Sequence, residues 1–119
     1  MNIENILNDI GFSEFISFDL ETTGLDVDKD EIIEISAVKF VDGEYHSDFT
    51  TLIKPKKEIS KQIIDLTGIN NQMVSNAPLI EDILDKFLSF IDNSALVAHN
   101  IEFDLSFINK VVNEHHKKI

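Results

Sequence analysis

One short segment near the N-terminus constrains the fold strongly, because acidic and apolar side chains alternate in it. Asp19 and Glu21 alternate with Phe18 and Leu20. Successive side chains of a β-strand point to opposite faces, so we expect a strand with both acids on one face and both apolar side chains on the other. Two neighbouring carboxylates repel each other unless a cation lies between them. The segment therefore predicts a strand whose polar face begins a divalent-metal site.

A third acid, Asp104, lies within an apolar stripe near the C-terminus. It shares one helical face with Phe107, Ile108 and Val111. A buried carboxylate must find a cation or hydrogen bonds, or take up a proton. Near a helix start it can also bond to the nearby backbone, which is the alternative to a metal role. Together with the first two acids, Asp104 predicts a site for Mg²⁺ or Mn²⁺, hard ions that also take phosphate oxygens, and hence a phosphate-ester substrate.

The hydropathy pattern predicts an alternating α/β order. Strands are expected over residues 14–20, 31–40 and 45–53, with a hairpin signal at Asp42-Gly43, so the three should form an antiparallel meander. The clearest helix is predicted by an apolar stripe of Ile80, Ile83, Leu84, Phe87, Leu88 and Ile91. The other expected elements are a short helix over 60–66, a polar connection over 70–78, a strand over 95–98 and a last helix over 101–117.

The acidic segments resemble the motifs of the DnaQ-like (DEDD) 3′-5′ exonucleases, a family that includes the proofreading exonuclease of bacterial DNA polymerase III. The run Phe18–Gly24 resembles the first motif, and Ala98–Asn100 with Phe103, Asp104 and Phe107 resembles the second. Ile64–Ile69 and Ala77–Pro78 match further stretches in the same order, so the resemblance spans residues 15–107. It implies the ribonuclease H-like α/β fold, a mixed sheet of an antiparallel three-strand meander and a parallel strand, with flanking helices.

The third motif of that family is missing from this chain. The motif pairs a His with a downstream Asp, and residues 105–119 contain no Asp. His115 and His116 do not replace it, because they lie at a charged helix end with no acid four residues onward. We therefore expect residues 1–119 to be a single exonuclease-like domain, C-terminally incomplete before the family's last strand and helix. It is either the front part of a longer protein or a shortened domain.

For an intact family member, the resemblance implies two-metal hydrolysis of the terminal phosphodiester. Asp19 would bridge two Mg²⁺ or Mn²⁺ ions, Glu21 would hold the ion that activates water, and Asp104 would support the second ion. These three acids are the catalytic and metal-binding candidates. The candidates for binding the 3′-terminal nucleotide are Thr22, Thr23, Leu25, Thr67 and Phe103.

Several of these positions have a structural alternative. Leu25 and Phe103 are equally compatible with plain packing. Asn100 is expected to cap a helix rather than to touch a ligand. His99 is expected to be a hydrogen-bonded structural residue rather than the general base. Glu34 and Glu102 are expected to be solvated or to lie behind the metal ligands.

Composition limits the possible binding partners and the cellular location. The formal net charge is −12, so binding to nucleic acid should be weak and salt-sensitive. The chain has no Cys, which excludes a disulfide framework and a thiolate metal site. No stretch approaches the roughly twenty apolar residues of a membrane span, so the cytoplasm is the expected location, with no membrane partner. The expected partners are a single-stranded or frayed nucleic-acid 3′ end and a polymerase or replication complex. DNA is the favoured substrate, although the motifs themselves do not separate DNA from RNA.

Two functions stay open after this reasoning. One is a metal-dependent 3′-5′ exonuclease whose missing acid and base come from elsewhere. The other is a non-catalytic module that binds metal, nucleotide ends or a protein partner. A general base contributes roughly 10²- to 10⁴-fold to such a reaction, so the missing third motif is the feature that separates them.

Overall fold

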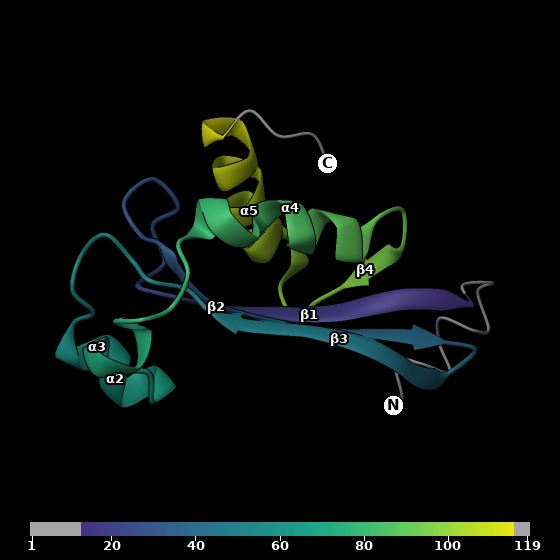
Figure 1. Cartoon of the computed structure of the whole chain (residues 1–119), viewed down its shortest axis with the longest axis horizontal. Helices are drawn as coiled ribbons and strands as arrows, with labels where there is room; N and C mark the ends of the chain where they lie inside the picture. The colour runs from purple at the N-terminus through teal and green to yellow at the C-terminus, as the bar shows by residue number, and fades with distance from the viewer. Residues whose placement is uncertain (1–12, 116–119) are drawn as a thin grey trace.

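A four-stranded mixed sheet forms the centre of the fold, and the computed structural model describes residues 13–115 around it (Figure 1). The strand order is β3-β2-β1-β4. Strands β1 (Glu14–Thr22), β2 (Ile32–Val41) and β3 (Glu44–Leu52) are antiparallel neighbours, and β4 (Ala95–Val97) runs parallel to β1. The predicted meander with one added parallel strand is confirmed.

The hairpin between β2 and β3 turns at Asp42 and Gly43, as the sequence predicts. Both residues have positive φ angles, 52° and 81°. Such a pair suits the tight turns whose twist matches that of the flanking strands. The turn thereby sets the register that pairs Val41 with Glu44 and continues down both strands.

Four helices complete the described fold. Helices α4 (Ile80–Ile91) and α5 (Ile101–Glu114) lie over one face of the sheet, whereas α2 (Lys61–Thr67) and α3 (Asn71–Val74) lie apart from them, beyond the end of β3 (Figure 1). Helix α3 corrects the expected polar connection over 70–78. It forms because the Asn70 side chain accepts a hydrogen bond from the Met73 backbone N–H at 2.9 Å, which caps the helix start. The last helix ends at Glu114, and its predicted extension over 116–117 lies outside the described residues.

The main core fills the space between the sheet and α4 and α5. On β1 the buried side chains are Ile16, Phe18 and Leu20, which pack in one cluster with Leu84 and Phe87 of α4. A smaller cluster of Ile33, Ile59, Ile69 and Val74 lies beneath α2 and α3. Because strand side chains alternate, burial of this set turns the intervening residues of β1 toward the other face.

None of the helices described within residues 13–115 is long and apolar enough to cross a membrane.

Candidate functional site

The first two acids project from the C-terminal half of β1. Asp19 lies opposite Ser36 and Glu21 lies opposite Glu34 on β2, and a register shift follows directly after Glu21. Asp19 is exposed and Glu21 is half-buried, whereas Phe18 and Leu20 between them are buried. The prediction that the acids share one face of a strand is therefore confirmed.

The third acid is delivered by the crossover from β4 into α5. Because β4 is parallel to β1, both strands end at the same edge of the sheet, and α5 begins there. Asn100 caps α5, since its side chain accepts a hydrogen bond from the Phe103 backbone N–H at 3.3 Å, as predicted. Asp104 follows one turn later and is only 5% exposed. The carboxylate accepts no hydrogen bond and joins no ion pair within residues 13–115. The alternative of a backbone-bonded Asp104 therefore does not hold in the described part of the chain.

The three carboxylates act on one another electrostatically. Burial, together with the negative charges of Asp19 and Glu21, raises the pKa of Asp104 to about 6, while His99 acts in the opposite sense. Burial also raises the pKa of Glu21, followed by the charges of Asp19 and Glu34. Like charges that face one another in this way favour proton uptake or a bound cation. Residues 85 positions apart in the chain thus share one electrostatic site.

The donor set fits a hard divalent cation bound in part by water and substrate. Within the part of the chain that the structure describes, no group of three His, Cys, Asp or Glu side chains is placed so that it could hold a metal ion. Mg²⁺ does not need three protein ligands, because it usually keeps several waters and binds one or two carboxylates together with substrate phosphates. Carboxylate oxygens with no hydrogen-bond donor among residues 13–115 are suitable ligands for that arrangement.

Two of the predicted nucleotide-binding residues continue the strand that carries the acids. The Thr22 hydroxyl donates to the Gly24 carbonyl at 2.6 Å. The Thr23 hydroxyl donates to the Asp30 carboxylate at 3.2 Å and accepts from the Glu31 N–H at 2.9 Å. These bonds fold the 22–31 segment into a compact turn at the edge of the site.

The other predicted nucleotide-binding residues differ in their surroundings. Leu25 is 87% exposed at the tip of that turn, so the packing alternative does not apply to it. Phe103 is half-buried and lies 5.0 Å from Phe107, ring centre to ring centre, so it does pack. Thr67 ends α2, which lies apart from α5 in Figure 1, and its hydroxyl donates to the Ile63 carbonyl. The structure thus brings Thr22 and Thr23 beside the acids, and it does not place Thr67 among them.

The site differs from the sequence-based expectation at His99, and it contains a close contact at Gly24 that the sequence interpretation did not include. His99 is exposed and has no hydrogen bond within residues 13–115, so the expected structural role is wrong; it lies on the turn after β4, outside the packed core. Gly24, which ends the first-motif run, lies so close to Asp30 that a Cβ at this position would overlap the Asp30 carboxylate. The Thr-Thr-Gly run was the signal for this close approach.

Comparison with known proteins identifies the class to which this fold and site belong. A family model described as Exonuclease matches residues 16–119, which include the sheet and both acid-bearing elements. The chain therefore belongs to the exonuclease family, and the resemblance read from its motifs is confirmed.

The similar curated proteins are DNA polymerase III proteins. The chain is 47% identical over 108 residues to a PolC-type DNA polymerase III of Thermotoga petrophila, which covers 89% of this chain and 8% of that protein. It is 40% identical over 104 residues to the DNA polymerase III subunit epsilon of Aquifex aeolicus, which covers 87% of this chain and 52% of that protein. The chain thus spans less than a tenth of the PolC-type relative and about half of the epsilon relative.

Solved structures agree on the architecture. A structure of exonuclease X in complex with 5′ overhanging duplex DNA is 30% identical, with a TM-score of 0.65 over 79% of this chain and 53% of that one. A structure of exonuclease I without ligand has a TM-score of 0.79 over 90% of this chain and 26% of that one. At 16% identity the second match shows the shared fold alone.

Proposed function

We propose that this chain is a 3′-5′ exonuclease domain that removes nucleotides from single-stranded or frayed 3′ ends of DNA. The observation that carries the proposal is the electrostatic effect of Asp19 and Glu21 on β1 upon the buried Asp104 of α5, in a member of the exonuclease family. DNA is favoured over RNA because the relatives are named as DNA polymerases and the exonuclease X structure contains duplex DNA.

In this proposal Asp19, Glu21 and Asp104 hold two Mg²⁺ or Mn²⁺ ions. The ions, when bound, neutralise the carboxylates and polarise water and the phosphodiester. The buried position of Asp104 keeps its side chain fixed in the packed start of α5, whereas Asp19 is open to solvent and to an incoming strand. One acid therefore anchors the site, and the acids of β1 face the substrate.

The 3′-terminal nucleotide is proposed to bind beside these acids. The backbone of Thr22 and Thr23 is held by hydrogen bonds to Gly24 and to residues 30–31, so it presents a rigid edge to the nucleotide. The exposed Leu25 side chain packs against the terminal base, and Phe103 forms an apolar wall that rests on Phe107. Thr67 is proposed to contact the strand from α2 rather than at the acids.

The same proposal assigns a setting. A polymerase or replication complex in the cytoplasm would deliver the frayed 3′ end, which compensates for the weak electrostatic attraction of a chain with net charge −12. The naming of the relatives as DNA polymerase III proteins supports this partner.

A second function is favoured by one observation: within residues 13–115 no group of three His, Cys, Asp or Glu side chains is placed so that it could by itself hold a metal ion. Such a domain would bind metal and nucleotide ends and turn over slowly or not at all. The two functions predict the same metal binding and different rates of nucleotide release.

The test is release of 3′-terminal nucleotides from a 5′-labelled single-stranded DNA oligonucleotide, with Mg²⁺ or Mn²⁺ against EDTA. Asp19→Asn should abolish release and Mn²⁺ binding measured by calorimetry. Asp48→Asn, an exposed acid on β3 of the same sheet, is the matched control and should change neither. Mn²⁺ binding that depends on Asp19 without release would establish the binding module, and unchanged Mn²⁺ binding in Asp19→Asn would refute the site.

A further inference from the structure

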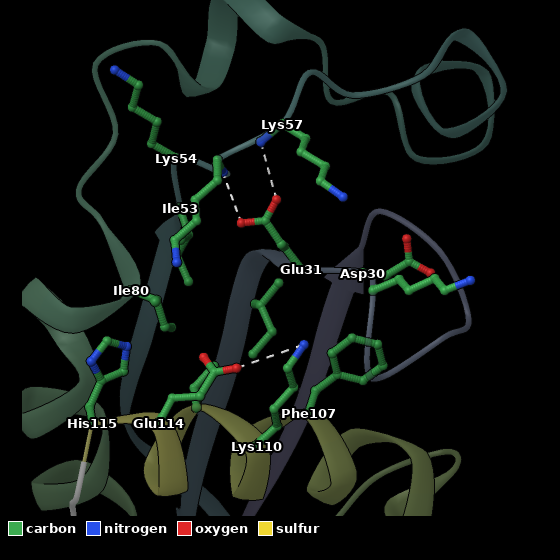
Figure 2. A pocket seen from close by; sticks show the side chains of 14 residues that line it. Asp30, Glu31, Ile53, Lys54, Lys57, Ile80, Phe107, Lys110, Glu114 and His115 are labelled. Carbon is green, nitrogen blue, oxygen red and sulfur yellow. Dashed lines mark hydrogen bonds and ion pairs between the residues drawn. The ribbon is translucent and has the colours of Figure 1, made fainter.

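A cavity lined by lysines lies between the 29–32 segment, the chain around 53–57 and helix α5 (Figure 2). Its volume is about 190 Å³. Half of the ten basic residues of the chain contribute to it, although the net charge of the whole chain is −12. The contributing lysines are Lys29, Lys54, Lys56, Lys57 and Lys110.

The carboxylates around this cavity are already engaged by neighbouring groups. Glu31 accepts hydrogen bonds from the backbone N–H groups of Lys56 and Lys57 at 2.8 and 3.2 Å (Figure 2). Asp30 accepts from the Asp26 N–H at 2.9 Å, and Glu114 pairs with Lys110 at 3.9 Å. Five lysines against three carboxylates leave the lining at +2 with His115 neutral.

Four of the lysine ammonium groups have no hydrogen-bond or ion-pair partner among the described residues. Lys29, Lys54, Lys56 and Lys57 are exposed, and their side chains form no hydrogen bond or ion pair within residues 13–115. Figure 2 shows Lys54 and Lys57 at the rim, extending away from each other. Four positive charges around one opening create a local positive potential, which attracts an anion.

The backbone of the segment that carries Lys54, Lys56 and Lys57 is held in place by hydrogen bonds. Lys54 N–H bonds to the Pro78 carbonyl at 2.9 Å, and the two N–H groups bonded to Glu31 follow it. Ile59 N–H donates to the Asn71 side chain at 2.7 Å, which closes the segment at its far end. Lysines that serve only solubility need no fixed backbone, whereas a preorganised segment lowers the entropy cost of binding a ligand.

The cavity is joined to the carboxylate site by a continuous chain of bonds. Thr23, directly after the acids of β1, is hydrogen-bonded to both Asp30 and Glu31, and Glu31 holds the lysine segment. Along α5, Lys110 lies six residues beyond Asp104, a rise of about 9 Å.

We propose that this basic cavity binds phosphate groups of the substrate strand, upstream of the 3′ end held at the carboxylates. The inference rests on the proposed exonuclease function and adds a strand-holding site to it. It gives this acidic chain a local cationic contact for the phosphodiester backbone. The lysines are positioning residues that hold the strand, and they take no part in bond cleavage.

The test measures fluorescence anisotropy of a 5′-labelled 12-nucleotide DNA strand with the 119-residue chain in EDTA, so that no metal-dependent cleavage occurs. The double variant Lys54→Gln/Lys57→Gln is compared with Lys61→Gln/Lys86→Gln, which removes the same charge from exposed lysines outside the cavity. The cavity variant should weaken binding at least threefold and lower the slope of log affinity against log salt by about 1.4. The control variant should leave affinity and slope close to those of the parent. Circular dichroism checks that both fold.

Four results would overturn the proposal. The first is equal weakening by both double variants, which would reflect net charge alone. The second is unchanged binding in the cavity variant, and the third is no binding by the parent at 10 mM salt. The fourth is full displacement of the strand by inorganic phosphate or thymidine monophosphate at matched phosphate concentration, which would indicate a site for free anions. Failure of the exonuclease function is distinguishable, because lysine-dependent strand binding would then persist without Asp19-dependent nucleotide release or Mn²⁺ binding.

Discussion

Replacing Asp104 with Asn should stabilise the metal-free protein above pH 6. Its carboxyl is 5% exposed, and its pKa is raised from 3.8 to about 6 by burial and by the charges of Asp19 and Glu21. A shift of about two units corresponds to roughly 3 kcal/mol. Water access at the edge of the sheet reduces this to about 1–2 kcal/mol. Asn keeps the shape and removes the charge, so the folded state gains that amount at pH 8.

The sign of the pH dependence follows from the direction of the shift. Below the unfolded pKa of about 3.9, Asp104 is protonated in both states and Asn gains little. As the pH rises through about 6, the folded protein loses the bound proton and the parent loses stability. The advantage of Asp104→Asn should therefore grow between pH 4 and pH 8.

Urea unfolding in EDTA at both pH values measures this difference, with Asp48→Asn as the exposed control. Adding Mg²⁺ should stabilise the parent more than Asp104→Asn, because a ligand that binds only the folded state adds to its stability. An Asp104→Asn variant less stable than the parent at pH 8, or one with the same advantage at both pH values, would refute the reasoning.

Four further changes test the packing and the turn. Phe87→Ala removes a side chain that is 1% exposed in the main core and should cost about 3–5 kcal/mol in urea unfolding. Gly68→Ala places a Cβ at φ 77°, where space is open but the conformation is unfavourable, and should cost roughly 1 kcal/mol by the same measurement. Glu31→Ala releases two backbone N–H groups of the lysine segment, and should speed cleavage by trypsin after Lys56 and Lys57. Leu25→Ala should change unfolding by less than about 0.5 kcal/mol yet raise the KM for strand cleavage, which steady-state kinetics would show.

The strands of the sheet and the three acids could be predicted from the sequence, because both follow from local periodicity. The alternation around Asp19 marks a strand whatever surrounds it, and an acid within an apolar helical stripe marks Asp104 as unusual. Helix α3 could not be predicted, because it is one short turn that depends on a single capping hydrogen bond to the Asn70 side chain. Propensity alone does not report such a bond.

The lysine cavity could not be read from the sequence for a different reason. Its residues come from segments around positions 29, 54–57 and 110, which only the folded chain brings together. The role of Glu31 in holding the lysine segment is equally long-range, since its partners lie 25 and 26 residues away. Net charge averaged over the whole chain hides a basic region of this size.

The brevity of β4 has a consequence for handling the protein. It pairs with β1 only from Phe15 to Ser17, so the backbone of β1 beyond Ser17 has no neighbour on that side among the described residues. Unpaired strand edges promote pairing with other chains, and charged side chains on the edge discourage it. We therefore expect Asp19 and Glu21 also to oppose edge-to-edge association in solution. Variants that neutralise them should self-associate more readily, so their oligomeric state must be checked by light scattering before any loss of activity is assigned to the site.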